Sequence, residues 1–138
     1  KSDVGVLIKG YLDRADIVPL EVGMRVVEHA LLSESKLLIL IDGFPPTIEY
    51  MDAFEALMGV HTSIKLLGAI AFEIDQNVAE ERVLGRCRSD DKRDNFLKRY
   101  RRYIINKISL SDRFAAYGLR KIDGAQSLEK VKIQFGKS

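Results

Sequence analysis

The chain has 138 residues, of which 46% are hydrophobic and 30% are charged, and its formal net charge is +2. This length and composition suit one domain with an apolar core, and no apolar run is long enough to cross a bilayer. The first residues lack the apolar core of a secretory signal, and the lone Cys87, predicted to be a surface residue, allows no internal disulfide. We therefore expect a cytoplasmic protein that does not bind membranes.

Positive charge is concentrated between Arg82 and Lys107, where ten Lys and Arg residues stand against three aspartates. Such a segment suits polyanions, either nucleotide phosphates or a nucleic-acid backbone. On charge alone, a solvated helix face explains it equally well.

Helices are predicted where apolar residues recur at intervals of three and four. They cover residues 4–14, a segment starting near Pro19, a segment capped by Thr47, residues 76–85, a long segment from Asp90 that ends by Gly118, and a terminal segment. In the terminal helix, Leu128, Val131 and Phe135 are expected on the inward face.

Strands are predicted over the apolar runs 37–41 and 64–74 and over the short LRKID run at 119–123. The first two runs are typical of buried strands. Their alternation with helices predicts a layered α/β domain with at least three parallel strands. Asp42 follows the first strand, where ligands of open α/β sheets bind, and an acidic residue there can hold Mg²⁺ through water. An ordinary Asp-Gly turn is the structural alternative.

Four segments, in their order and spacing, resemble the adenylate kinase family of nucleoside monophosphate kinases, which includes the uridylate-cytidylate kinases. They are GYLDRADIVPLEV, LIDGFPPT, FEIDQNVAEERVLGR, and RSDDK followed by LKRY. The resemblance covers nearly the whole chain and implies a three-layer, parallel-sheet, phosphate-loop kinase-like fold. It divides the chain into a monophosphate-binding part (1–36), a core (37–81), a short lid (82–91) and a C-terminal core (92–138).

The resemblance implies phosphoryl transfer from ATP, with Mg²⁺, to a nucleoside monophosphate such as AMP, UMP or CMP. On the matched positions, Asp42 would serve Mg²⁺ through water. Arg82 would pack against the ATP base, and Arg86 would contact the ATP phosphates. An exposed charge on a helix is the alternative for Arg82.

The same resemblance assigns residues to the acceptor and to the lid. Val18 would lie in the region whose backbone contacts the acceptor base, and Arg88 and Arg99 would contact phosphates, so that Arg86, Arg88 and Arg99 form the catalytic set. Asp90 and Asp91 would orient these arginines when the lid closes. Acids also favour the start of a helix, which is the alternative for the two aspartates.

The sequence departs from the family pattern at several places. No G-x-x-x-x-G-K motif occurs in the 138 residues, so the fold is expected to be incomplete, with its central phosphate-loop strand supplied from outside them. Pro46 replaces the arginine that grips the monophosphate, and Tyr50 replaces the glutamine that reads the base. Only Cys87 separates Arg86 from Arg88, where relatives have a longer loop.

Two functions follow as hypotheses. The first is a nucleoside monophosphate kinase with a degenerate acceptor site. The second is a catalytically inactive adenylate kinase-like module for structure or interaction in a larger assembly, such as a ciliary complex, where a protein partner or a further chain segment completes the sheet. A nucleic-acid-binding helical protein ranks third, since aromatic and basic residues interleave at KRYRRY.

Overall fold

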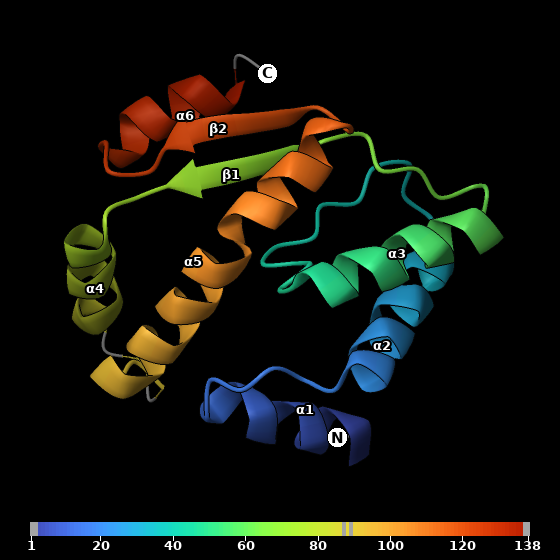
Figure 1. Ribbon diagram of the computed structural model, residues 1–138, viewed down its shortest axis with the longest axis horizontal. Coiled ribbons are helices and arrows are strands. Elements are labelled where there is room, and N and C mark those ends of the chain that lie inside the picture. Colours follow the sequence, from blue (N-terminus) through green and yellow to red (C-terminus); the bar gives the residue numbers. More distant parts are fainter. Residues whose placement is uncertain (1–2, 87, 89, 137–138) are drawn as a thin grey trace.

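The structure is a computed structural model that describes residues 3–86, 88 and 90–136. Cys87 lies outside the described residues. Figure 1 shows the elements, which follow in the order α1 (Asp3–Asp13), α2 (Leu20–Ser33), α3 (Ile48–Val60), β1 (Ala69–Glu73), α4 (Gln76–Gly85), α5 (Arg93–Ala115), β2 (Leu119–Asp123) and α6 (Leu128–Gly136). Over these residues, no helix combines the length and apolar character needed to cross a membrane.

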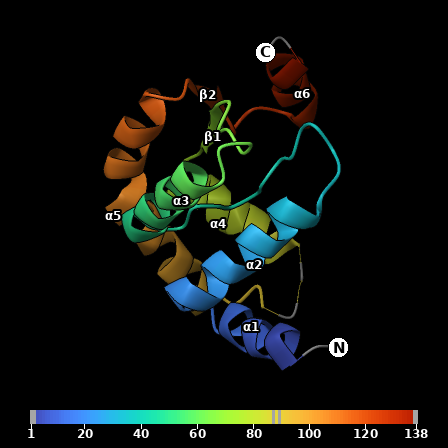
Figure 2. The same ribbon diagram turned by 90° about the vertical axis from the view of Figure 1, so that its right-hand side faces the viewer.

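The sheet is small and parallel. β1 and β2 pair from Ala69 opposite Leu119 to Glu73 opposite Asp123. Figure 2 shows α5 on one side of the two strands and α6 on the other, so the chain forms three layers at this end. Parallel strands joined through helices are typical of α/β proteins, as the sequence predicted.

Local signals in the sequence set several helix boundaries. Pro19 stands at the N-cap of α2, and the Thr47 hydroxyl accepts a hydrogen bond from the Tyr50 backbone N–H at 3.4 Å, which caps α3. Gly118, with a φ of 83°, reverses the chain between α5 and β2. The predicted bounds of α4 and β2 agree with the structure.

The predicted strand over residues 37–41 is wrong for this chain. These residues form an extended loop between α2 and α3 and pair with no strand among the described residues. Their apolar side chains face solvent, with Leu38 65% and Leu40 79% exposed. A strand needs a neighbour for its backbone hydrogen bonds, and β1 does not pair with this segment. Hence two strands, instead of at least three, form among the described residues.

The second predicted strand is also shorter and more exposed than expected. Only Ala69–Glu73 of the run 64–74 is a strand, and Ile70 and Phe72 are exposed. In the described part of the chain, the edge of β1 opposite β2 has no strand partner. Residues 37–41 and β1 do not pair directly with each other. This agrees with the prediction that a strand from outside these residues fills the gap between them.

The inward face predicted for α6 is only partly buried. Val131 is half-buried, but Leu128 and Phe135 are exposed. A sheet of two strands is too narrow to cover the whole helix. The buried apolar core lies instead around α3, α5 and β2 and comprises Ala15, Tyr50, Met51, Phe54, Phe96 and Ile122.

Candidate functional site

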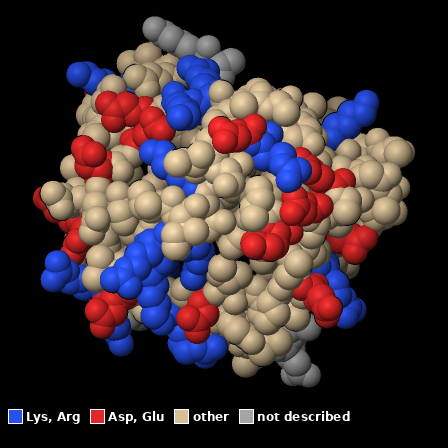
Figure 3. All heavy atoms as spheres, in the orientation of Figure 1, with Lys and Arg blue, Asp and Glu red and all other residues tan. Residues whose placement is uncertain are grey.

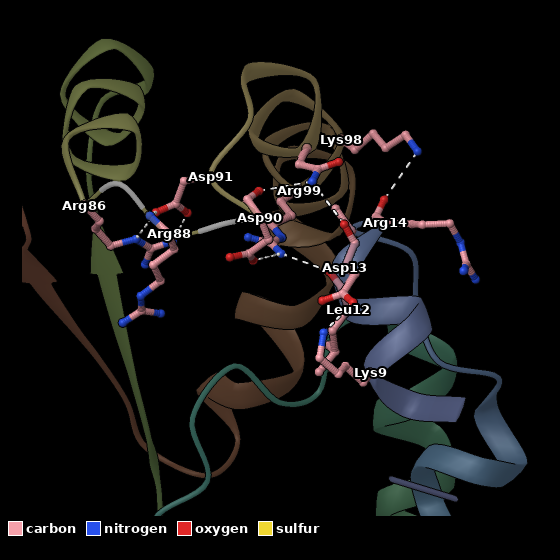
Figure 4. A network of polar contacts seen from close by, with 12 residues as sticks. Lys9, Leu12, Asp13, Arg14, Arg86, Arg88, Asp90, Asp91, Lys98 and Arg99 are labelled. Atoms are coloured by element: carbon pink, nitrogen blue, oxygen red, sulfur yellow. Dashed lines mark hydrogen bonds and ion pairs between the residues drawn. The ribbon is translucent and has the colours of Figure 1, made fainter. Parts of the chain in front are cut away.

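Arginines and aspartates meet between α4 and α5 in what we call the arginine–aspartate cluster, formed by Arg86, Arg88, Asp90, Asp91 and Arg99 (Figure 4). Asp91 accepts two hydrogen bonds from Arg86, one from Nε at 3.0 Å and one from Nη2 at 2.6 Å. The Arg88 backbone N–H donates to the same carboxylate at 3.1 Å. The Asp91 side chain has 0% exposure, so this bidentate ion pair is shielded from water on the carboxylate side.

The second ion pair of the cluster joins Asp90 to α5. Arg99 Nη2 donates to Asp90 Oδ2 at 2.8 Å and also lies 3.3 Å from the Leu12 carbonyl oxygen. The hydrogen bond from Arg99 lowers the pKa of Asp90, and that from Arg86 lowers the pKa of Asp91. Asp91 in turn raises the pKa of Arg86. Asp90, Asp91 and Arg86 are therefore charged at neutral pH.

Basic and amide side chains of α5 also hold the end of α1. Asn95 Nδ2 donates to the Asp13 backbone carbonyl at 3.2 Å. Lys98 Nζ donates to the Arg14 backbone carbonyl at 3.4 Å, and Arg102 Nη2 donates to the Ala15 backbone carbonyl at 2.7 Å. The carbonyl end of a helix is negative, and its last carbonyls lack partners within the helix. Part of the positive charge of α5 therefore has a structural role that the sequence analysis did not assign.

Positive charge gathers where the sequence placed it. On the face drawn in Figure 3, Lys and Arg side chains collect at the lower left, over the N-terminal half of α5. Arg101, on the same helix, is exposed, and its side chain makes no hydrogen bond or ion pair with the residues that the structure describes. It provides a matched control for the arginines of the cluster.

The ion pairs of the cluster should respond to acid. Because both aspartate pKa values are lowered on folding, the pairs stabilise the loop at neutral pH and are lost as the pH falls below the ordinary aspartate value of 3.8. We expect the Arg86 Nε–H signal in NMR spectra to move to its solvent-exposed position through that range. In the Asp91→Asn variant, the Arg86 Nε–H signal should be at the solvent-exposed position already at neutral pH. In the Asp94→Asn variant, the signal should not move at neutral pH. An Arg86 signal unchanged by Asp91→Asn would contradict the assignment.

Arg82 lies at a second place, beside the carboxyl ends of the two strands. Its guanidinium donates to three successive carbonyls of the turn after β2, from Nη1 to Gly124 at 2.5 Å and from Nη2 to Ala125 at 3.1 Å and Gln126 at 3.4 Å. An open cavity of about 460 Å³ adjoins it, with walls formed by Phe72, Ile74, Arg82, Gly124, Gln126, Ser127, Leu128 and Val131. Apolar walls beside a cation and carbonyl groups suit a flat aromatic ligand.

The sequence analysis missed the turn after β2, although a signal was present. Ile-Asp-Gly occurs twice, at 41–43 and at 122–124. In the second copy, Asp123 accepts from the Ala125 backbone N–H at 2.9 Å and from Gln126 Nε2 at 3.0 Å, which shapes the turn. These two hydrogen bonds lower the pKa of Asp123.

The remaining predicted residues lie apart from these contacts. Asp42 is exposed in the loop beside Gly43, which has a φ of 68°. No group of three or more His, Cys, Asp or Glu side chains that could hold a metal occurs among the described residues. A lone exposed carboxylate still fits Mg²⁺, which keeps its waters and takes one or two carboxylates together with phosphates. The Val18 carbonyl accepts a hydrogen bond from the Tyr50 hydroxyl at 2.8 Å.

Comparison with known proteins gives a clear result, although no family model matches. A protein of a Nitratiruptor species, named adenylate kinase, is 35% identical over 132 residues, which cover 94% of this chain and 68% of that protein. The adenylate kinase of Nautilia profundicola is also 35% identical, over 94% of this chain and 69% of its own length. An adenylate kinase of Helicobacter pylori is 34% identical over 95% of the chain and 70% of its own length.

The chain belongs to the adenylate kinase family. Membership confirms the predicted phosphate-loop kinase-like fold, here incomplete because the parallel sheet has two strands in the part of the chain that the structure describes. Adenylate kinase relatives also support nucleoside monophosphate kinase-type function in general. The roles of individual residues remain predictions.

Proposed function

We propose that this chain contributes the monophosphate-binding part, the core and the lid of a nucleoside monophosphate kinase that converts ATP and a nucleoside monophosphate into ADP and a nucleoside diphosphate. The observation that supports this most is the arginine–aspartate cluster, where Asp91 and Asp90 hold Arg86 and Arg99 beside the Arg88 segment. On this proposal, residues 1–36 bind the monophosphate, 37–81 and 92–138 form the core, and 82–91 form a short lid.

The cluster suits phosphoryl transfer because this reaction spreads negative charge over the transferring oxygens. Arginine matches phosphate through its planar fork of N–H groups, and it stabilises developing charge best when its position is fixed beforehand. Asp90 and Asp91 would supply that fixed position. Closure of the segment over the phosphates would then exclude water that could otherwise accept the phosphoryl group.

The donor nucleotide would lie at the carboxyl ends of β1 and β2. Arg82 and the apolar walls of the adjoining cavity would hold the ATP base. Asp42 would hold Mg²⁺ through water, and the metal would neutralise charge on the ATP phosphates. Arg86 would approach the same phosphates from the lid.

The test is conversion of AMP to ADP by the full-length protein in the presence of ATP and Mg²⁺, measured with a coupled assay. We expect turnover that depends on ATP. The absence of both turnover and ATP binding would contradict the proposal.

An inactive interaction module is the second candidate, favoured by the exposed apolar loop at 37–41 and the unpaired edge of β1 in the described part of the chain. A protein that binds a partner through these surfaces, without binding ATP, would meet that description. ATP titration of the full-length protein separates the two candidates.

The acceptor side should bind monophosphates weakly because Pro46 offers neither a charge nor an N–H donor. A charge-assisted hydrogen bond contributes about 1.5 to 3 kcal/mol, so Pro46→Arg should tighten binding roughly tenfold to a hundredfold. Since the gain comes from the phosphate, AMP, UMP and CMP should benefit alike in calorimetric titrations of the full-length protein. Tight binding by the parent protein that Pro46→Arg leaves unchanged would show that another cation grips the phosphate.

A further inference from the structure

Tyr50 is a buried polar residue that links α3 to the segment before α2. Its side chain is 5% exposed, and its ring packs edge-on against Phe44 with the ring centres 5.8 Å apart. The hydroxyl donates to the Val18 carbonyl at 2.8 Å and lies 3.3 Å from the Pro19 carbonyl. Burial raises the pKa of Tyr50, so the hydroxyl keeps its proton and acts as the donor.

The ring occupies space that exists only because residue 23 is glycine. A Cβ atom at Gly23 would lie 2.0 Å from the Tyr50 hydroxyl oxygen and 2.8 Å from the adjacent ring carbon. Both distances are far below van der Waals contact. The phenol therefore lies directly against the backbone of α2 and occupies the space next to Gly23.

We propose that Tyr50 itself occupies the acceptor-base position and keeps the base out. The tyrosine side chain resembles the base in shape and polarity, because a nucleobase with an amino group is also a flat aromatic ring with a polar donor. A base amino group that donated to Val18 would have to displace the tyrosine hydroxyl from that carbonyl. This inference rests on the proposed function, since it places the acceptor base at Val18.

The inference separates two defects in one site. Pro46 weakens the grip on the phosphate and affects every monophosphate equally, whereas Tyr50 blocks the base. Restoring only the phosphate contact should therefore give a protein that binds monophosphates without distinguishing their bases. Opening the base position should add discrimination between AMP, UMP and CMP.

The test uses the full-length protein carrying Pro46→Arg, compared with the same protein carrying in addition Tyr50→Gln, Tyr50→Phe or, as a matched control, Tyr117→Gln. Tyr117 lies in the turn between α5 and β2, and its hydroxyl donates to Glu55 of α3 at 3.1 Å. Each variant is titrated calorimetrically with AMP, UMP, CMP and, separately, ATP. If Tyr50→Gln lowers the folded fraction in thermal unfolding, Tyr50→Met, which keeps an apolar side chain on α3, takes its place.

We expect Tyr50→Gln to tighten binding of at least one monophosphate about tenfold over Pro46→Arg alone and to separate the three bases. Tyr50→Phe keeps the ring and should give no gain, and Tyr117→Gln should have no effect. The inference is wrong if Pro46→Arg alone already distinguishes the bases, if Tyr50→Phe gains as much as Tyr50→Gln, or if opening position 50 changes nothing. Loss of ATP binding in every variant, with the Tyr50→Gln gain retained, would instead overturn the proposed kinase function and leave the inference intact.

Discussion

The 138 residues by themselves should transfer no measurable phosphate from ATP to AMP, UMP or CMP. ATP binding in this fold needs backbone N–H groups and a lysine that surround the phosphates and keep Mg²⁺ in register, and the sequence contains no G-x-x-x-x-G-K motif. The arginine–aspartate cluster supplies charge but cannot replace that geometry. A coupled assay of the isolated chain against the full-length protein measures the difference. Ordinary ATP-dependent turnover by the isolated chain would overturn this expectation.

Arg88→Ala should lower kcat/KM of the full-length protein by about a hundredfold or more, because on the proposed function its guanidinium contacts the phosphates, and removal of one group that stabilises transition-state charge has effects of that size. Arg88 suits this test better than Arg99, which also lies 3.3 Å from the Leu12 carbonyl at the end of α1. Loss of Arg99 would therefore mix catalysis with the packing of α1.

The control for Arg88→Ala is Arg101→Ala, which removes the same side chain from an exposed position of α5. Arg101→Ala should change kcat/KM by less than about twofold, as expected for a surface charge whose side chain has no partner in the described part of the chain. Equal losses in the two variants would mean that general positive charge, and not the cluster, supports activity.

Sequence patterns were sufficient for elements whose signals are local. The N-cap at Thr47, the turn at Gly118 and the bounds of α4 and β2 each depend on residues next to one another in the chain. Residues 37–41 have the composition of a buried strand, yet a strand forms only against a neighbour. Their loop conformation therefore could not be predicted from the run itself.

Contacts between distant segments were the least predictable part of the site. The spacing of Asp90, Asp91 and the nearby arginines is local. Asp91 contacts Arg86 and Asp90 contacts Arg99, while their role in orienting these arginines stays a prediction. The Arg102 side chain donates to the Ala15 carbonyl, 87 positions away in the sequence. The Arg82 side chain donates to the Gly124 carbonyl, 42 positions away. Tyr50 was recognised as a departure from the family pattern, but only the fold shows that it lies on Val18.

The most direct measurement of the central claim is an NMR titration of the full-length protein, with isotope-labelled arginine, by ATP and Mg²⁺. If the cluster binds the transferring phosphates, the guanidinium signals of Arg86, Arg88 and Arg99 should shift together and saturate, while that of Arg101 stays in place. Binding of ATP that leaves those three signals unmoved, or that shifts Arg101 equally, would contradict the account.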